Sequence, residues 1–200
     1  MRYAPILALG AVLFSAIALP RQQQPTAGEP DALPEKAVQL NRAVMQKFSD
    51  TLKETLQQAV QNGGPASGMV VCRDKASQIA TELSTEANMI VGRTSLKLRN
   101  PNNAPDNWEL AVLKQFDARH AQGESAEKLE FFAIIDDDQG QKTLRYMKAI
   151  PTTTLCLSCH GENINPEVDA KLNEWYPNDK ARGYQEGELR GAFTLATPLP

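Results

Sequence analysis

The sequence predicts an α+β fold in which an antiparallel sheet is covered by helices that are segregated to one face. Three observations predict this class. Helical and strand-like segments are mixed along the chain, with no internal repeat, GxGxxG motif or phosphate-binding loop. Two β-rich runs, 130–136 and 142–150, flank the turn-forming stretch DDDQGQ and predict a hairpin. A last strand is expected at 190–197, close to the end of the chain.

The N-terminal segment has the pattern of an export signal. Arg2 precedes an uncharged, mostly apolar run that ends at Leu19, and Ala16-Ile17-Ala18 has the small-x-small form of a cleavage site. We therefore expect residues 1–18 to be a signal peptide and the protein to be periplasmic or otherwise exported. A retained membrane anchor is the alternative, because the run is nearly long enough to span a bilayer.

A proline-rich segment separates this signal from one folded domain. Residues 19–34 contain four prolines and no helical pattern, which predicts a disordered linker. Residues 35–200 then form one domain of ordinary size.

The domain opens with a long amphipathic helix at 35–62, which Gly63-Gly64-Pro65 is expected to end. Its apolar residues recur at near-helical spacing: Leu40, Val44, Phe48, Leu52, Leu56 and Val60. This stripe either packs on the core of its own chain or pairs with a second copy in a homodimer.

The next segments are shorter. The apolar run 69–71 predicts a brief strand that leads into Cys72. A helix is expected at 74–86, where Ile79, Ala80 and Leu83 share one face.

The second half of the domain is expected to alternate loops with helices. Residues 89–98 are expected to be extended, and the stretch RNPNNAPDN at 99–107 predicts a loop. Residues 108–122 place Leu110, Leu113 and Phe116 on one helical face, and a short helix is expected at 166–175.

Composition excludes some classes of function. The chain has 200 residues, 42% of them hydrophobic, and a net charge of −3 without a basic stripe, so nucleic acid is not an expected partner. Its three cysteines cannot all be used by intramolecular disulfides. Because free thiols tend to oxidise outside the cytosol, we expect other chemistry to use them.

The stretch CLSCHG at 156–161 offers that chemistry. Cys156 and Cys159 have the spacing that forms two thioethers with the vinyl groups of a haem, and His160 then supplies an imidazole to the iron. Gly161 leaves room for the macrocycle beside the backbone. The motif therefore predicts one covalently attached haem c, which fits an exported protein.

Two other uses of this motif are less favoured. A zinc site would need four ligands, and the adjacent Cys159 and His160 can hardly both face one tetrahedral ion. A thiol redox pair is expected in a βαβ unit with its motif at the start of a helix. Here the motif follows a predicted strand and precedes GENINP, which has no helical pattern.

The sixth iron ligand has several candidates. His120 lies in a polar setting, and most of the methionines Met45, Met69, Met89 and Met147 are better explained as core residues. Cys72 is the sharper candidate, because a predicted helix N-terminus together with Arg73 and Lys75 would favour its thiolate. From the residues alone, a buried free cysteine explains Cys72 equally well.

Four stretches together resemble a known family. They are VVCRDKA, VGRTSLKLRNPNNAPDNWE, LRYMKAIPTTTLCLSCHG and YPNDKARGYQEGELRGAF. Over residues 35–200 the chain resembles the single-haem, PAS-like c-type cytochromes of cyanobacterial type, which were long catalogued as a domain of unknown function. Some members stand alone, and others form the sensor part of histidine kinases and chemoreceptors.

This resemblance implies a PAS-like, five-stranded antiparallel sheet with flanking helices and one covalent haem. It also implies that His160 and Cys72 are the two axial ligands. Arg93, Arg99 and Tyr146 lie in the matching stretches, and we expect them to contact the haem carboxylates.

The implied function is a redox or gas sensor that is not an enzyme. It would work with a redox or signalling partner protein, with CO or NO as candidate ligands. A low-potential electron-transfer cytochrome is the alternative. A haem peroxidase is a weaker one, because it needs an acid–base residue in an open site and His120 is poorly placed for that role.

Overall fold

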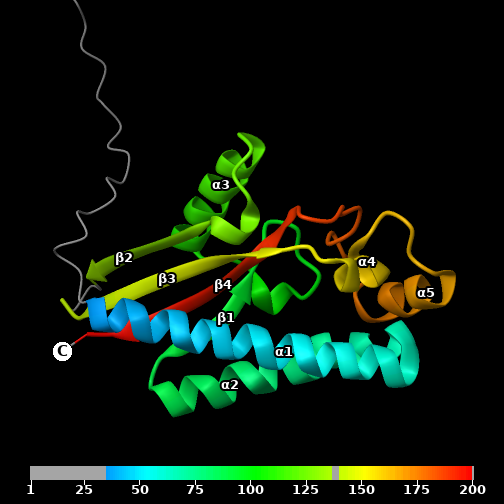
Figure 1. The fold of residues 1–200 in the computed structure, drawn as a ribbon, viewed down its shortest axis with the longest axis horizontal. Coiled ribbons are helices and arrows are strands. Elements are labelled where there is room, and N and C mark those ends of the chain that lie inside the picture. The colour runs from blue at the N-terminus through cyan, green and yellow to red at the C-terminus, as the bar shows by residue number, and fades with distance from the viewer. Residues whose placement is uncertain (1–34, 137–139, 200) are drawn as a thin grey trace, which may run out of the picture.

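A four-stranded antiparallel sheet forms the centre of the protein in the computed structural model, which describes residues 35–136 and 140–199 (Figure 1). Its order is β1-β4-β3-β2, and each neighbouring pair is antiparallel. The strands are β1 (Ile90–Thr94), β2 (Glu130–Asp136), β3 (Lys142–Pro151) and β4 (Leu189–Pro198). The α+β class, the hairpin and the terminal strand are confirmed, whereas the sheet in this part of the chain has four strands rather than five.

The missing strand is the predicted run 69–71, which is helical. Helix α1 (Glu35–Val70) breaks at Gly63 and Gly64, where Gly64 has a positive φ of 71°. Pro65 follows the break, at a position where proline starts a helix readily because it needs no N–H partner. The helix then continues through the π-helical segment η2 (Val71–Lys75) into α2 (Ala76–Ala87). A predicted end at Gly63 is therefore correct, but the chain starts a second helix there instead of a strand.

The helical segments before and after this break, 35–62 and 65–87, fold back on each other as a hairpin (Figure 1). The segments approach each other tightly at Gly68, because a Cβ at this residue would lie 2.7 Å from Val60 Cγ2 and 3.0 Å from Leu56 Cδ1. Glycine at this position allows the helices to touch.

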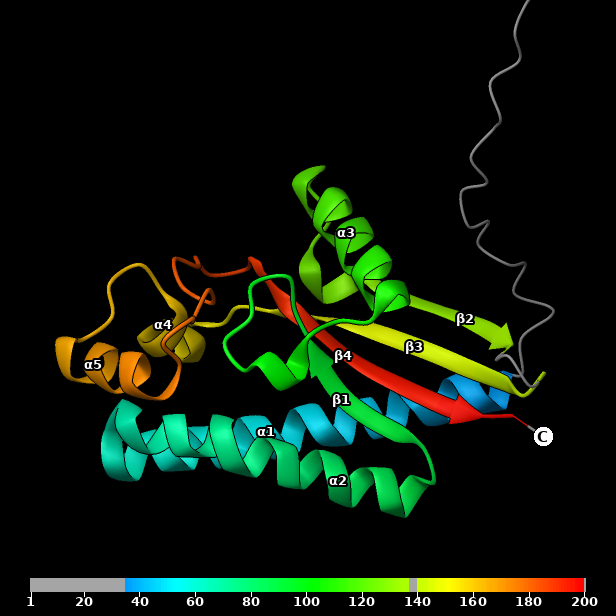
Figure 2. The same cartoon turned by 180° about the vertical axis from the view of Figure 1, so that it is seen from behind.

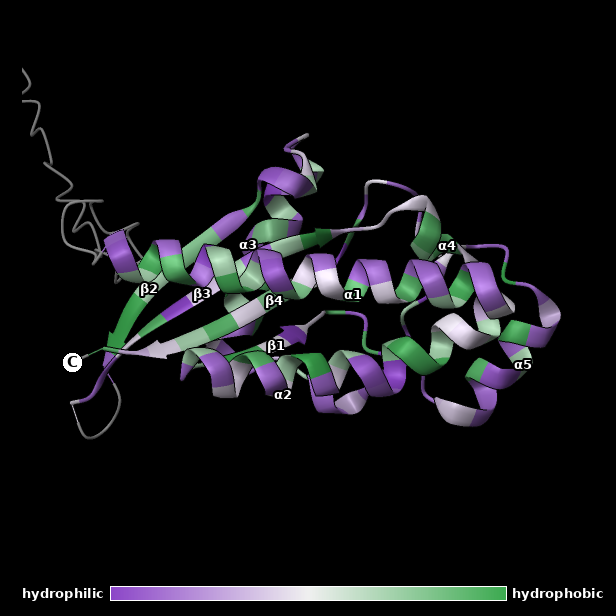
Figure 3. Ribbon diagram, turned by 60° about the horizontal axis from the view of Figure 1, so that its bottom comes forward, coloured by the Kyte–Doolittle hydropathy of each residue, from purple (hydrophilic) through white to green (hydrophobic). Residues whose placement is uncertain are grey.

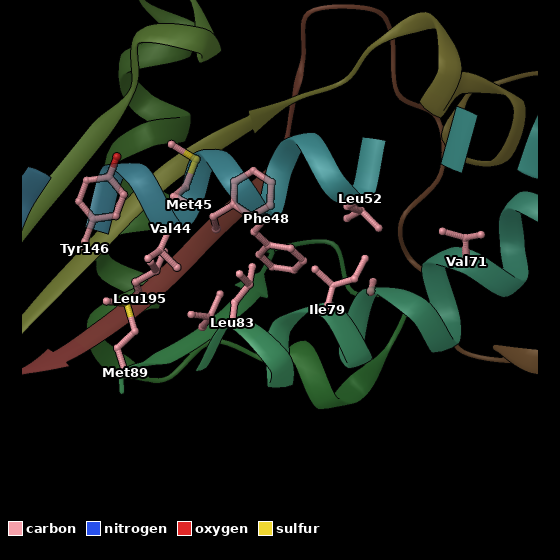
Figure 4. Close-up of a cluster of buried hydrophobic side chains, with 13 residues drawn as sticks. Val44, Met45, Phe48, Leu52, Val71, Ile79, Leu83, Met89, Tyr146 and Leu195 are labelled. Atoms are coloured by element: carbon pink, nitrogen blue, oxygen red, sulfur yellow. The ribbon is translucent and has the colours of Figure 1, made fainter. Parts of the chain in front are cut away.

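Helices cover both faces of the sheet, in contrast to the predicted single face (Figure 2). Successive strand residues point to opposite faces, and both Tyr146 and Met147 of β3 are fully buried. On one face, α1 and α2 enclose a core that includes Phe48, Leu83 and Leu195 (Figure 4). On the other face, α3 (Asn107–Ala121) encloses a second cluster around Phe116 and Met147.

Two short helices form a lobe beyond the end of the sheet, α4 (Thr154–His160) and α5 (Pro166–Trp175) (Figure 1). Met69, at the end of α1, packs against Val168 and Leu172 of α5. Polar and apolar residues alternate along α1 (Figure 3). Within residues 35–136 and 140–199, no helix is long and apolar enough to cross a membrane.

Gly191 of β4 provides a test of this packing. A Cβ at this residue would lie 2.4 Å from Thr94 O, and a backbone atom cannot move aside as a side chain can. We expect Gly191→Ala to lower the free energy of unfolding by about 1–3 kcal/mol, measured by chemical denaturation. Gly92→Ala is the matched control, because its Cβ would make an ordinary 3.6 Å contact with Thr194. Equal stability of the two variants would contradict this packing.

Candidate cofactor site

A cavity of about 560 Å³ lies where the helical hairpin, the end of the sheet and the α4–α5 lobe meet. This volume lies within the range of small-molecule and cofactor sites. Six of the seven residues predicted for the site line this cavity: Cys72, Arg93, Arg99, Cys156, Cys159 and His160. Side chains from widely separated parts of the sequence therefore face one space.

The CLSCH motif forms the short helix α4 directly after β3. Cys156, Cys159 and His160 stand at positions i, i+3 and i+4, so one helical face carries all three toward the cavity. Gly161 ends the helix, and a Cβ at this residue would lie 2.6 Å from Leu157 O. The contact with Leu157 O already requires a glycine here, and the room that Gly161 leaves for a macrocycle stays a prediction.

The imidazole of His160 has one nitrogen committed to the protein. Its Nδ1 lies 2.7 Å from Ala181 O and therefore donates to this carbonyl. Burial, Arg190 and Arg99 hold the pKa of His160 well below its ordinary value. The ring is thus neutral, with its lone pair on Nε2. Arg99 Nη1, at 3.4 Å from Nε2, is too distant for a strong hydrogen bond, so Nε2 is suited to bind a metal.

Arg99 braces the motif rather than standing free in the cavity. Its guanidinium pairs with Asp179 at 2.9 Å. Nη2 also donates to Cys159 O at 2.6 Å and to Ala181 O at 3.1 Å. The structure thus places Arg99 beside the site as predicted, but its charge is already balanced by a buried carboxylate.

Cys72 lies in the π-helical segment η2, which reaches the cavity between α1 and α2. Such segments are frequent at functional sites. The predicted helix N-terminus is absent here, because the second helix starts near Pro65. Burial raises the pKa of the Cys72 thiol, and Arg93 opposes that rise. A nearby guanidinium therefore replaces the helix dipole as the group that favours the thiolate.

Two arginines in the cavity have no acidic partner. Among the residues that the structure describes, neither Arg93 nor Arg190 forms an ion pair with a carboxylate. Arg93 lies over the Phe48 ring, 5.9 Å from its centroid, and Arg190 donates to Ser95 Oγ at 3.0 Å. Burial lowers the pKa of both guanidinium groups. Because charges held away from water are normally paired, these half-buried guanidinium groups indicate an anionic ligand.

Arg190 was missed in the sequence because a charged residue at the start of a predicted strand is usually exposed. Its place within YPNDKARGYQEGELRGAF, one of the stretches that resemble the family, is the signal that could have found it.

Tyr146 does not line the cavity. It is fully buried in the core, where its hydroxyl donates to Glu130 Oε2 at 2.8 Å. Burial and the Glu130 carboxylate raise the pKa of Tyr146 above its ordinary value. The predicted contact with a haem carboxylate is therefore not possible in this arrangement, and the residue packs in the sheet.

The other predicted iron ligands divide into two groups. Met45 and Met69 line the cavity, so their thioethers remain alternatives to Cys72. His120, Met89 and Met147 are not among its lining residues, and His120 Nδ1 bonds Glu124 O at 2.8 Å.

The zinc alternative gains no support from the described part of the chain. Cys72, Cys156 and Cys159 are all free. Within these residues, no group of three or more His, Cys, Asp or Glu side chains is arranged to hold a metal ion directly.

Comparison with known proteins identifies the family of the chain. No curated protein matches the chain. Among solved structures it is similar to the cyanobacterial heme-protein Tll0287, with a TM-score of 0.59 and 25% sequence identity over 84% of this chain and 98% of the other. The model of the Tll0287-like family matches residues 30–198, which is most of the sequence. The chain belongs to the Tll0287-like family.

Proposed function

We propose that this chain is an exported c-type haem protein that senses redox state or a small gas molecule. One observation carries the proposal: Cys156, Cys159, His160 and Cys72 line one cavity. Cys156 and Cys159 would hold one haem through thioethers, with His160 and Cys72 as its axial ligands. The similar cyanobacterial structure is that of a heme-protein, which supports the choice of cofactor.

The charge of the cavity fits this cofactor. A haem carries two carboxylates, and the cavity holds two guanidinium groups without acidic partners, those of Arg93 and Arg190. We propose that these two arginines bind the carboxylates. Arg99 would instead orient the motif, since Asp179 already neutralises it.

When bound, a haem supplies a one-electron change of charge at its iron. As a thiolate, Cys72 would be an anionic donor to the iron and would favour the ferric state. Burial raises the pKa of its thiol, so the protonated form would be favoured whenever Cys72 is not bound to the iron. Segment η2 is continuous with α1 and α2, so loss of this tether would alter the helical hairpin.

A low-potential electron carrier is the second candidate, and the mouth of the cavity favours it. Exposed residues of the lining, among them Gln46, Lys53 and Glu127, show that the cavity opens between α1 and the segment before β2. A redox protein could reach the cofactor there. A peroxidase is less favoured, because His160 is the one histidine in the lining.

Export, partner and oligomeric state belong to the same proposal. The predicted signal peptide, 1–18, and linker, 19–34, lie outside the described residues. We propose a redox or signalling protein as the partner and α1 as the surface of a homodimer.

A redox titration followed by visible spectra, with and without CO, tests the sensor against the carrier. If Cys72 leaves on reduction, CO binds only the reduced protein and raises the apparent midpoint potential. The rise is about 59 mV for each tenfold excess of CO over its dissociation constant. If CO changes neither the spectrum of the reduced protein nor the midpoint potential, the result would contradict the sensor function and favour the electron carrier.

A further inference from the structure

Asp179 is a buried carboxylate at the centre of a hydrogen-bond network. Its side chain is 2% exposed and lies in the connection between α5 and β4. Oδ2 accepts from Arg99 Nη2 at 2.9 Å and from Arg182 Nε at 2.9 Å, and Oδ1 accepts from Ala181 N at 2.9 Å. Two charged donors and one backbone donor fix this carboxylate in place.

Two of these partners also hold the CLSCH motif. Arg99 Nη2 donates to Cys159 O at 2.6 Å, and Ala181 O accepts from His160 Nδ1 at 2.7 Å. Arg99 donates to Ala181 O as well, at 3.1 Å. The carboxylate is therefore connected to the His160 ring through the backbone N–H and C=O of one residue, Ala181, and to the motif backbone through the side chain of Arg99.

We infer that Asp179 is the positioning residue for His160, fixing its imidazole with Nε2 toward the cavity and supplying the negative charge behind it. The groups around a metal-binding histidine set its orientation and its strength as a donor. This inference rests on the proposed function, because it takes His160 as an iron ligand. It predicts that Asp179 lowers the reduction potential without touching the cofactor.

Asp169 offers a matched control. It also pairs with Arg182, through Nη1, and its side chain is 40% exposed on α5. Among the described residues it has no hydrogen bond with Arg99 or Ala181. Asp169→Asn and Asp179→Asn therefore remove the same charge from the same arginine, but only the second change reaches the groups that hold His160.

The test is a potentiometric titration of both variants, purified with haem attached. Asp179→Asn is expected to favour the reduced form by at least tenfold, which is a rise in midpoint potential of about 59 mV. Asp169→Asn is expected to change the ratio of reduced to oxidised protein by less than threefold. Equal shifts in the two variants, or no shift in Asp179→Asn, would overturn the inference.

Arg99→Lys decides the question if Asp179→Asn does not fold. Lysine keeps the charge but cannot bridge Asp179, Cys159 O and Ala181 O together, so a weaker His160 bond and a partly high-spin ferric spectrum are expected. A wild-type spectrum in this variant would overturn the inference. Wild-type protein without haem would instead overturn the proposed function, so the two failures are distinguishable.

Discussion

Replacement of both Cys156 and Cys159 by alanine is expected to abolish covalent haem attachment and leave the fold intact. Both thiols are half-buried on the short helix α4, and alanine is the best helix former. Cys156 Sγ lies 3.3 Å from Thr153 Oγ1, and the loss of this contact costs little because sulfur is a weak hydrogen-bond donor and acceptor. The helix should therefore survive the change, while the two groups that form thioethers are gone.

Mass spectrometry of denatured protein measures this result directly. Wild-type chain from cells that mature c-type cytochromes should carry the mass of one haem, and the double variant should carry none. Cys72→Ala is the control, because it removes the third cysteine and should keep the haem mass. Haem retained by the denatured double variant would contradict attachment through this motif.

Cys72→Ala is expected to change the state of the iron itself. Loss of an anionic donor removes stabilisation of the ferric form, so the midpoint potential should rise. A rise on the order of 100 mV is expected, a fraction of the roughly 0.8 V range that axial ligands span. The ferric low-spin band should weaken or shift at the same time, and redox titration with visible spectra records both effects.

The two methionines in the cavity provide the controls for this variant. Met45→Leu and Met69→Leu conserve volume, so each should cost less than about 1.5 kcal/mol of stability. Both should keep the wild-type ferric spectrum if Cys72 is the ligand. An altered spectrum in Met69→Leu, together with an unchanged one in Cys72→Ala, would assign the sulfur to Met69.

Local sequence patterns predicted most helices and strands of this fold, and the error at 69–71 has a physical cause. Val70 and Val71 have β-branched side chains, yet Pro65 starts a helix and Gly68 lets it pack against the first segment of α1. That contact depends on how the chain folds back after Gly64, so propensity does not report it. Burial of both sheet faces was missed for the same reason, since the position of α3 depends on tertiary packing.

The residues of the site also divide into those that local sequence predicted and those that depend on tertiary contacts. Cys156, Cys159 and His160 are close in sequence, so their spacing was enough to assign them to one site, although the helix α4 that carries them was not predicted. Cys72 was the sharper candidate from its neighbouring residues and was assigned as a ligand by resemblance, and the groups around it differ from those predicted. Arg190 and Asp179 act through contacts that only the folded chain creates, and Tyr146 was assigned to the site although it packs in the core. The spacing of residues along the chain does not reveal such tertiary contacts.

Iron X-ray absorption of the oxidised protein tests most directly whether the iron lies between His160 and Cys72. The expected result is one sulfur donor at the iron in wild-type protein, lost in Cys72→Ala and retained in Met45→Leu and Met69→Leu. An iron with only nitrogen and oxygen donors in wild type, or a sulfur donor that persists in Cys72→Ala, would contradict it.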